Sequence, residues 1–528
     1  MRHGNAAGQE RAVSLTRKNV IILVLDGMRA DRLGCYGHYR DTSPAIDRLA
    51  KKSTVCKNHY TVGKASTQSH VSLFTGVHPQ FHGAADNCSY YDGRFPTLPE
   101  LLGREGYYTY GISSLNPYLS AESGVLRGYD RYVRIAKSKA KTLNSTLLGK
   151  ITKTMFGKAV GGGEIYRWLL SRLGGNLNKY WEQFYLNNDS SGQLLVNTLA
   201  EEITKFPKGR PFFVFANILE THAPYLAPQA FREFFGKVTI TDGLRNALFG
   251  YADQYSSADH ILTDEEIEAA GILHDCEVRY VDFLVGQLVE ALEKEGKLED
   301  TVFVITSDHG GMLGEHENMI GPIRNTYQGI MKTPLIISCP DMVRKEEDRL
   351  TSIIDIFATV LAATGTKNYY RYNYQCKNVL SDDWDRGFVI CEITPLPYQQ
   401  RHIKRAQQVA VVLRDSHVNR TIITKTHKLI WRSNGRHLLF DLKSDPGEKN
   451  NLFQAACAPL FSDLLQMMVR WYEAQWESER PFCLETFEYS QWDLSKGSGP
   501  KGINNAQDPS AISVIADSMN RIVSRPVP

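Results

Sequence analysis

The chain has little cysteine, little excess charge and no long apolar run, and each shortage excludes a class of protein. Its nine cysteines in 528 residues are scattered from Cys35 to Cys483 without a C-x-x-C pair, unlike a disulfide scaffold or a zinc ribbon. The formal net charge is only +3 and the charges are interspersed, so composition does not indicate a nucleic-acid partner. No stretch approaches the roughly 20 apolar residues that a membrane span needs.

Two further absences concern location and chemistry. Residues 1–18 are polar and lack the apolar region of a secretory signal, and the thiols are typical of a reducing compartment, so we expect a cytoplasmic location. No internal repeat and no G-x-x-x-x-G-K-[ST] phosphate loop occurs. What the chain does have is 42% hydrophobic residues over its whole length, which predicts a large core and two or more structural units.

Three apolar runs that read as strands each end on a side chain able to bind a metal or move a proton. NVIILVLD ends on Asp26, TVFVITSDH ends on Asp308 and His309, and PFFVFANILETH ends on His222. In open α/β sheets, ligands bind beyond the carboxyl ends of the strands, so this pattern predicts a site. The alternative is that Asp308 caps the next turn and His309 is only a polar residue at the end of the strand.

A hydroxyl-rich loop supplies the second part of the candidate site. Residues 60–83 read YTVGKASTQSHVSLFTGVHPQFHG, in which Ser66, Thr67 and His70 precede an apolar stretch typical of a helix. A helix N-terminus presents unpaired N–H groups and partial positive charge, which suit sulfate or phosphate oxygens. A serine or threonine N-cap without chemistry remains the alternative.

The rest of the pattern gives the expected organisation. Proline at position 44 after Thr42 and Ser43 predicts a capped helix start, a helix is expected around 275–295, and another over 352–365. Alternating strands with a helix near 461–476 predict a small antiparallel sheet in the C-terminal part. The predicted divisions are a tail over 1–18, a catalytic α/β domain over 19–367 with an insertion over 131–181, a C-terminal subdomain over 368–483 and a tail over 484–528.

The insertion is basic and aromatic. Between Arg131 and Gly163 it carries eight lysines and arginines and no acidic residue. It is either a solvated basic face or a lid or wall that contacts the substrate or a membrane surface. Residues 226–262 are expected to form a mobile segment on the substrate side.

Taken together, these segments resemble the sulfatase family of the alkaline phosphatase superfamily. The resemblance rests on several motifs in the family's order and covers most of 19–455: NVIILVLDGMRADRLGCYG, TSPAIDRLA, S-x-x-S-H-x-S-L-F-T-G-x-x-P-x-x-H-G, TVFVITSDHGGMLGEH and LLFDLKSDPGEKNNL. It implies a large mixed, mostly parallel sheet flanked by helices, with a smaller C-terminal α+β subdomain.

The resemblance also implies roles for the candidate residues. Asp26, Asp308 and His309 would bind one divalent cation, with Ca²⁺ as the first choice and Mn²⁺, Mg²⁺ or Zn²⁺ as alternatives. Ser66 falls on the nucleophile position, which the family converts to formylglycine, and Thr67 is the fallback if the loop is shifted by one residue. His222 matches the histidine of the family's H-x-P-Y motif and would protonate the leaving oxygen.

Several positions depart from the family's pattern. Gln68 and His70 stand where the conversion signature has proline or alanine and arginine, so conversion of Ser66 is an open question. Gly27 stands in place of a second aspartate, Asn116 follows the strand where a Lys-x-His is usual, and Pro322 replaces a lysine. The sequence offers two replacement cations. His70 would take the place of the arginine, although a histidine at a helix start could instead bond only the backbone. Arg324, from a later loop, is the other candidate. His316 is interpreted as structural.

Three functions follow from this combination. The first is a metal-dependent hydrolase that cleaves the sulfate ester of a small molecule or glycan. The second is a phosphodiesterase or a phosphoryl or phosphoethanolamine transferase that uses unmodified Ser66 or Thr67 with one metal. The third is a catalytically inactive binding protein. The sequence indicates no oligomeric state.

Overall fold

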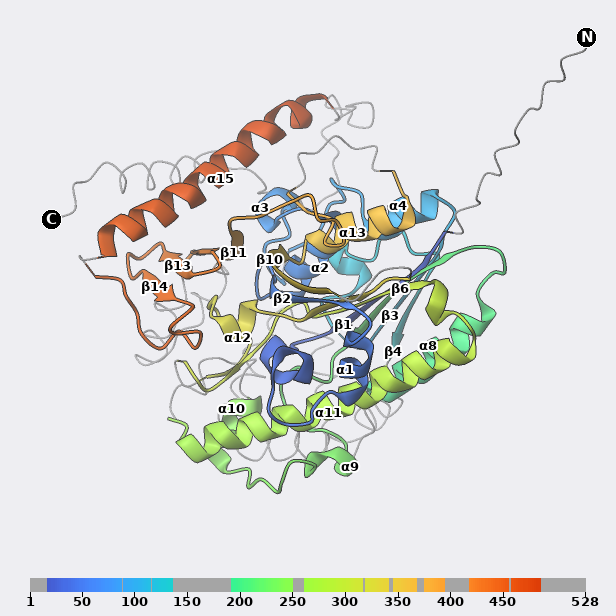
Figure 1. Cartoon of the computed structure of the whole chain (residues 1–528), viewed down its shortest axis with the longest axis horizontal. Coiled ribbons are helices and arrows are strands. Elements are labelled where there is room, and N and C mark those ends of the chain that lie inside the picture. Colours follow the sequence, from blue (N-terminus) through green and yellow to red (C-terminus); the bar gives the residue numbers. More distant parts are fainter. Residues whose placement is uncertain are drawn as a thin grey trace, which may run out of the picture. The chain divides into compact units, whose positions relative to one another are not determined.

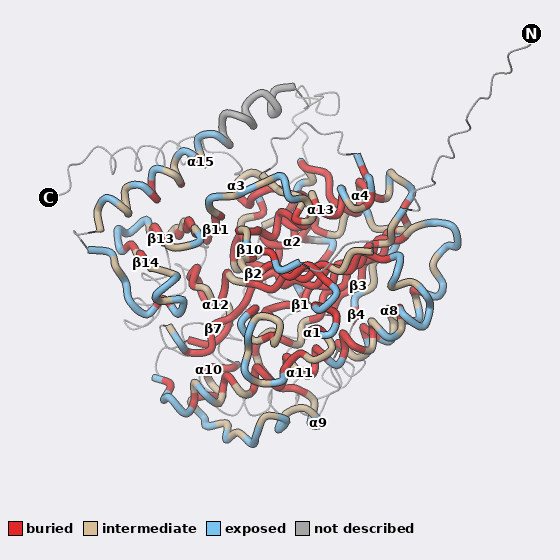
Figure 2. Tube along the Cα trace, in the orientation of Figure 1, coloured by how far each residue is buried: buried red, intermediate tan, exposed pale blue. Residues whose placement is uncertain are grey.

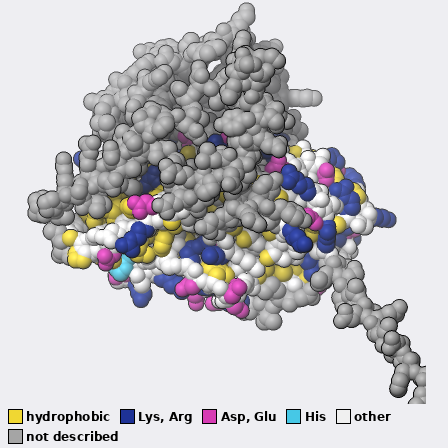
Figure 3. Space-filling model, turned by 90° about the horizontal axis from the view of Figure 1, so that it is seen from above, with side chains coloured by type: hydrophobic (Ala, Val, Ile, Leu, Met, Phe, Trp, Pro, Cys, Tyr) yellow, Lys and Arg dark blue, Asp and Glu magenta, His cyan; other side chains and the backbone are white. Residues whose placement is uncertain are grey.

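The computed structural model describes residues 17–485, with side chains up to 474, and forms two compact units, Met1–Val469 and Arg470–Pro528 (Figure 1). The segments outside the described residues are 88, 115, 136–190, 250–260, 317–318, 341–344, 368–374, 395–416 and 455–456. Within the described part, no helix combines the length and the apolar character needed to span a bilayer. Basic and acidic side chains are interspersed on the described surface seen in Figure 3.

An eight-stranded sheet forms the centre of the first unit. In spatial order its strands are β10 (Lys345–Ser352), β2 (Thr54–Tyr60), β9 (Leu335–Ser338), β6 (Thr301–Thr306), β1 (Asn19–Leu25), β5 (Phe212–Ile218), β3 (Tyr108–Ser114) and β4 (Arg131–Ile135). Only β9 runs antiparallel to its neighbours, so the predicted mixed, mostly parallel sheet is confirmed.

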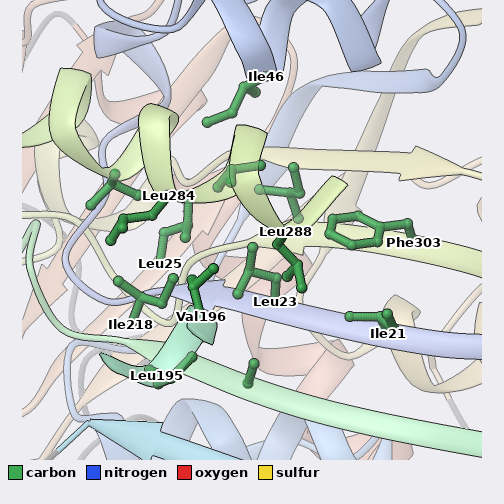
Figure 4. Packing of buried hydrophobic residues seen from close by; sticks show 14 of the residues in the cluster. Ile21, Leu23, Leu25, Ile46, Leu195, Val196, Ile218, Leu284, Leu288 and Phe303 are labelled. Atoms are coloured by element: carbon green, nitrogen blue, oxygen red, sulfur yellow. The ribbon is translucent and has the colours of Figure 1, made fainter. Parts of the chain in front are cut away.

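Helices cover both faces of this sheet, which is why its strands are nearly continuous apolar runs. Side chains of β1 alternate between two hydrophobic clusters. Leu23 and Leu25 pack with α1 (Pro44–Ala50), α8 (Ser191–Lys205) and α11 (Asp264–Lys294), as Figure 4 shows for Leu284 and Leu288 of α11. On the opposite face, the sheet packs against α2 (Ser66–Thr75), α4 (Leu98–Arg104) and α13 (Asp355–Thr364). The buried colour in Figure 2 follows the strands between these layers.

The predicted antiparallel sheet is also present, as a four-stranded meander in the first unit. Its strands are β11 (Val389–Ile393), β12 (Asn419–Ile423), β13 (His427–Arg432) and β14 (Leu438–Asp441). The pattern RTIITKTHKLIW at 420–431 predicts one strand, but these residues form two strands joined by a turn. The pattern AQQVAVVLR at 406–414 predicts a further strand, and these residues lie outside the described part of the chain. Helix α15 (Ala458–Glu485) includes the predicted helix and continues beyond it.

Short elements complete the described part of the chain. They are α3 (Pro79–His82), α9 (Gln229–Arg232), α10 (Asp242–Phe249), α12 (Gln328–Met331), β7 (Met312–Leu313) and β8 (Ile320–Gly321), with single 3-10 turns η1 (Ala30–Arg32), η2 (Gly34–Tyr36), η3 (Ala121–Ser123) and η6 (Leu298–Asp300). Helices α9 and α10 fall in the segment 226–262, which was expected to be mobile.

Three local expectations were wrong in detail. Ser43 precedes α1 but makes no side-chain cap, because the carboxylate of Asp282 on α11 accepts from the N–H groups of Ala45 and Ile46 at 3.1 and 2.8 Å. Helix α11 begins at Asp264, eleven residues before the predicted 275, because Thr263 forms a capping box with Glu266.

The third correction concerns the start of the insertion. Residues 131–135 belong to the large sheet as edge strand β4, which pairs with β3 and carries the first two basic residues of the stretch. The remainder of the basic insertion, with its predicted aromatic helix, lies outside the described residues. What the insertion does is therefore still a prediction.

Candidate functional site

The candidate site lies at the carboxyl ends of three neighbouring strands. β1 pairs with β5 on one side and β6 on the other, in registers that bring the ends of the three strands together. Asp26 directly follows β1, His222 follows β5, and Asp308 with His309 follows β6. All four side chains are buried or nearly so. The strand-end pattern in the sequence therefore corresponds to one place in the fold.

Two carboxylate oxygens in this place have no hydrogen-bond partner among the described residues. They are Asp26 Oδ1 and Asp308 Oδ2, and both side chains are fully buried. His309 Nε2 lies 3.8 Å from the first and 3.6 Å from the second. These separations are too long for hydrogen bonds but suit ligands arranged around a cation bound at about 2.0–2.6 Å. Because an unpaired buried carboxylate is costly, the three residues fit a divalent ion.

The remaining polar atoms of these ligands are held by neighbours. Asp26 Oδ2 accepts from the amides of Asn116 at 2.8 Å and Asn217 at 3.3 Å. Asp308 Oδ1 accepts from the backbone N–H of His309 at 3.0 Å, and His309 Nδ1 lies 2.8 Å from the carbonyl of Gly310. If Nδ1 donates there, Nε2 carries the lone pair, as second-shell bonds usually arrange for a metal-binding histidine.

His222 belongs to the same cluster. Candidate ligand atoms of Asp26, His222 and His309 all lie within 4.8 Å of one another, and the two imidazole rings are 5.6 Å apart. His222 Nδ1 is 2.9 Å from the carbonyl of Ala223, which leaves Nε2 as an acceptor in the neutral ring. The sequence assigned His222 to proton transfer, whereas its position also suits a metal ligand.

Burial dominates the electrostatics of the cluster. It raises the pKa of Asp26, and the nearby charge of Asp308 adds to the effect. Burial also acts to raise the pKa of Asp308, but His309, His70 and a hydrogen bond from Ser66 outweigh it, so this pKa is lowered. Burial lowers the pKa of His222 to about 4. A divalent cation would favour the ionised form of both carboxylates.

Ser66 is the first residue of α2 and reaches this cluster. Its side chain is buried and acts to lower the pKa of the Asp308 carboxylate. Ala65 is the N-cap of α2 and makes no side-chain cap, so neither Ser66 nor Thr67 serves as the N-cap. Thr67 is also buried; its N–H donates to Asn87 Oδ1 at 3.0 Å, while its hydroxyl has no hydrogen-bond partner among the described residues. Ser66 is therefore a residue that acts on a proposed metal ligand.

His70 lies one turn further along α2. Its Nδ1 is 2.7 Å from the carbonyl of Ser66 and 3.9 Å from Asp308 Oδ2, and its ring packs edge-on against Phe215 at 5.5 Å. Burial lowers its pKa, which favours the neutral ring. This is the geometry of a histidine that bonds backbone at a helix start, so His70 holds the first turn of α2 beside the metal cluster.

The departures from the family's pattern have local explanations. Gly27 has φ +77°, and a Cβ there would lie 3.1 Å from both the Cα of His222 and the carbonyl of Thr221, so a second aspartate would strain the backbone. Asn116 instead binds Asp26. His316 stacks on Tyr327 with ring centroids 4.1 Å apart and lies 2.9 Å from the carbonyl of Gly447 through Nε2, in keeping with a structural role. Arg324 is buried, and its carbonyl accepts from Asn419.

Sequence reasoning missed two residues of the cluster. Asn217 was hidden inside an apolar strand, although an amide in an otherwise apolar buried run is a usable signal. Lys64 precedes Ser66 by two residues, and its charge contributes to lowering the pKa of His222. It is a cation on the nucleophile loop that the search for replacement cations overlooked.

Comparison with known proteins gives a consistent picture. A family model described as Sulfatase matches residues 18–366. The chain is 22% identical over 477 residues to an arylsulfatase of Clostridium perfringens, covering 83% of this chain and 91% of that protein. Its fold is similar to a phosphonate monoester hydrolase of Agrobacterium radiobacter, with a TM-score of 0.65, 18% identity and coverage of 87% and 96%. It is also similar to BT4656 in complex with its substrate D-glucosamine-2-N,6-O-disulfate, with a TM-score of 0.64, 18% identity and coverage of 88% and 99%.

Proposed function

Since the chain belongs to the sulfatase family, whose members are sulfuric ester hydrolases, we propose that it cleaves a sulfate ester at the cluster of Asp26, Asp308 and His309, with Ser66 at the nucleophile position. One observation carries the proposal. Two buried carboxylate oxygens without hydrogen-bond partners among the described residues flank His309 Nε2, and Ser66 acts to lower the pKa of one of these carboxylates, Asp308.

The proposed cofactor is one divalent cation. Asp26, Asp308 and His309 would hold it, and His222 is close enough to be a further ligand. Oxygen-rich ligands favour Ca²⁺, while two imidazoles would move the preference toward Mn²⁺ or Zn²⁺. The ion would supply Lewis-acid polarisation of the sulfate oxygens and lower the pKa of the nucleophile.

The protein's own groups would then divide the reaction between them. The hydroxyl of Ser66, or its formylglycine hydrate if the residue is converted, attacks sulfur, and the bond between sulfur and the leaving oxygen breaks. If His222 does not ligate the cation, its neutral ring, with a lone pair on Nε2, would take the proton of the attacking hydroxyl and then give it to the leaving oxygen. His70 and Asn116 keep Ser66 and Asp26 in position.

A phosphodiester or phosphonate ester is the second candidate substrate. The fold similarity to a phosphonate monoester hydrolase favours it, and so does Gly27, which leaves one metal-type carboxylate at the end of β1. Sulfate monoesters and phosphodiesters both present a tetrahedral, singly charged centre, so the same cluster could act on either. The outcome of an assay separates these two from the third candidate, a binding protein without activity.

The test combines mass spectrometry with an assay of the metal-loaded full chain. The peptide containing Ser66, isolated from the native host, would show the mass of serine or of formylglycine. The protein is then assayed with sulfate esters, phosphodiesters and phosphonate esters in the presence of Ca²⁺ or Mn²⁺. Metal-dependent release from a sulfate ester supports the first function, and release from phosphorus esters alone supports the second. Metal binding without turnover of any ester contradicts both.

The proposed substrate is a sulfated or phosphorylated small molecule or glycan that extends beyond its anionic group. The basic stretch after β4 would contact that extension and supply binding energy away from the reacting centre. Deleting residues 137–158 should then weaken hydrolysis of a large sulfated compound more than that of a small chromogenic ester. An equal effect on both substrates, or none, contradicts this role.

A further inference from the structure

The hydroxyl of Thr61 lies between the nucleophile helix and a proposed metal ligand. Thr61 directly follows β2, and its side chain is fully buried. Its Oγ1 donates to the carbonyl of Asp308 at 2.6 Å and lies 3.0 Å from the hydroxyl of Ser69 on α2. A hydroxyl has one proton, and the Asp308 carbonyl is closer to it than the carbonyl of Gly63, at 3.4 Å. The hydroxyl of Ser69 then donates to Thr61 or to the carbonyl of Gly63, which is 3.2 Å from it.

The backbone of Thr61 is bonded on both sides, so the hydroxyl projects from a fixed position. The N–H of Thr61 donates to the carbonyl of Met331 at 2.9 Å, and its carbonyl accepts from the thiol of Cys391 on β11 at 3.0 Å. The carbonyl of Val62, the next residue, accepts from the N–H of Glu392 at 2.8 Å. The loop that leads to the nucleophile is therefore anchored to the small sheet and to the end of α12.

The contact between Thr61 and Asp308 joins the ends of two strands that are not neighbours in the sheet. β9 lies between β2 and β6 and runs antiparallel to both, so β2 and β6 end at the same edge. Two strand spacings amount to about 9–10 Å. The Thr61 hydroxyl and the Asp308 carbonyl are nevertheless 2.6 Å apart. The two loops therefore converge over the start of β9, and this hydroxyl links them directly.

The same link reaches the helix that carries the nucleophile. Ser69, the partner of Thr61, lies one turn after Ser66 in α2. His70 Nδ1 is 2.7 Å from the carbonyl of Ser66 and 3.9 Å from Asp308 Oδ2, so the first turn of α2 lies close to the carboxylate of Asp308. Thr61 thus ties α2 to the main chain of the residue whose side chain this first turn approaches.

We infer that Thr61 is a positioning residue whose hydroxyl holds the start of α2 against Asp308, so that Ser66 keeps its place beside the metal cluster. This inference rests on the proposed function, which it extends by naming a residue that aligns the nucleophile with a proposed metal ligand. Removing the hydroxyl would take a donor from the Asp308 carbonyl at a buried position and would let the loop that carries Asp308 shift relative to α2. Loss of a group that orients a metal ligand weakens metal affinity or activity by about 10- to 100-fold.

The test compares Thr61→Val and Thr61→Ser with the control Thr75→Val in the full chain. Valine removes the hydroxyl and keeps a side chain of similar shape, whereas serine keeps the hydroxyl. Thr75 is also fully buried on α2, and its hydroxyl donates to the carbonyl of Val71 at 2.7 Å within the same helix. The control therefore loses one buried hydroxyl without losing a link to Asp308, and we expect the two valine variants to lose similar amounts of melting temperature.

Two readouts separate positioning from a purely structural role. The first is calorimetry with Ca²⁺ or Mn²⁺, whichever binds the wild type more tightly. This ion should bind Thr61→Val about 10- to 100-fold more weakly than Thr75→Val, and Thr61→Ser should recover most of the affinity. The second is turnover of a sulfate ester at saturating metal, for which kcat should fall in Thr61→Val while KM changes little. Equal metal affinity in the two valine variants overturns the inference.

Failure of the proposed function would give a different result. If the wild type binds the ion but hydrolyses no ester, the proposed hydrolysis is wrong, and the difference in metal affinity between the valine variants still decides the role of Thr61. If the wild type hydrolyses a sulfate ester and the valine variants have equal metal affinity, the proposed function stands and the role of Thr61 is wrong. A wild type that binds neither ion contradicts both.

Discussion

The first unit contains two clusters of fully buried charged side chains, and they differ in whether the charge is neutralised by a close partner. Lys428 on β13 and Glu448 form an ion pair at 2.6 Å with both side chains completely buried, and Glu448 also accepts from the N–H of Gln328 at 2.6 Å. At the strand ends, Asp26 Oδ1 and Asp308 Oδ2 face only imidazoles among the described residues, those of His309 and His70, at the longer distances of 3.6–3.9 Å, and neither oxygen accepts a hydrogen bond. Where the chain neutralises its own buried charge, the role is structural. Where it leaves charge unpaired, a ligand is needed.

The two clusters are nevertheless connected. Gln328 begins α12, and the carbonyl of Ile330 in that turn accepts from the N–H of Gly310, the residue after His309, at 2.8 Å. The ion pair of the small sheet therefore supports the loop that carries two proposed metal ligands. Breaking each cluster separately should show which one serves stability and which one serves function.

The largest effect is expected for Asp308→Ala. It removes one proposed ligand and one unpaired carboxylate, so metal binding and activity should be lost together, with kcat/KM reduced by roughly 10³-fold or more if Lewis-acid assistance is lost. The free energy of unfolding of the metal-free protein should change little, because relief of a buried carboxylate offsets the loss of the hydrogen bond that Asp308 Oδ1 accepts from the N–H of His309. Metal analysis, kinetics and urea unfolding measure the three quantities. Asp300→Ala, an exposed aspartate just before β6, is the control. Full activity with stoichiometric metal in Asp308→Ala would rule out the assignment.

The opposite result is expected for Lys428→Met. Removing one member of a buried ion pair leaves an uncompensated charge and should lower the free energy of unfolding by about 3–5 kcal/mol. The folded fraction should still bind one metal ion. The double variant Lys428→Met with Glu448→Gln should lose less, since the amide oxygen can still accept from Gln328 and no charge is left unpaired. A double variant as unstable as the single one would contradict this account of the pair.

Adding metal should stabilise variants that keep the proposed metal ligands and leave a ligand variant unchanged. An ion that binds only the folded state stabilises it by about 2.7 kcal/mol at a hundredfold excess over Kd. Thermal unfolding with and without Ca²⁺ or Mn²⁺ should show this shift in wild type and in Lys428→Met, but not in Asp26→Asn. A shift of the same size in Asp26→Asn would place the metal somewhere else.

The smallest effect concerns a third kind of buried ionisable group, histidines kept neutral outside the metal cluster. Burial lowers the pKa of His59, His78, His82 and His274 to about 3 in each case. Below the usual histidine pKa of about 6.5, these side chains bind protons in the unfolded chain but not in the folded chain. The free energy of unfolding is therefore highest above that pH and falls as the pH decreases. At pH 5.5 each histidine should lower the free energy of unfolding by about 1.4 kcal/mol.

Urea unfolding between pH 7.5 and about 5.5 measures this slope. His59→Gln should reduce the pH slope of the unfolding free energy by the contribution of about one proton, because glutamine does not titrate. Glutamine also keeps a partner for Thr351, which lies 3.0 Å from His59 Nδ1. An unchanged slope in His59→Gln would contradict the neutral burial of that ring.

The sequence by itself determined the framework of the site. Apolar runs of strand length, each followed by a polar residue, gave the ends of β1, β5 and β6, because a buried strand must be apolar and must end where polar groups begin. The hydroxyls before an apolar stretch predicted the start of α2 for a similarly local reason. The proposed metal ligands Asp26, Asp308 and His309 could thus be named before their geometry was known, and the structure brings these residues together.

Only the tertiary structure decided how those residues are supported. Asp282 caps α1 from a distance of 236 residues in sequence, Asn217 turns an amide from inside β5 toward Asp26, and Lys64 reaches Pro322 across 258 residues. Tertiary packing also decided two further features: the buried pair of Lys428 and Glu448, and the inclusion of residues 131–135 in the sheet. Local patterns report what a segment prefers, but a hydrogen bond or an ion pair needs a partner within about 3–4 Å, and which distant segment supplies that partner is fixed only when the chain packs.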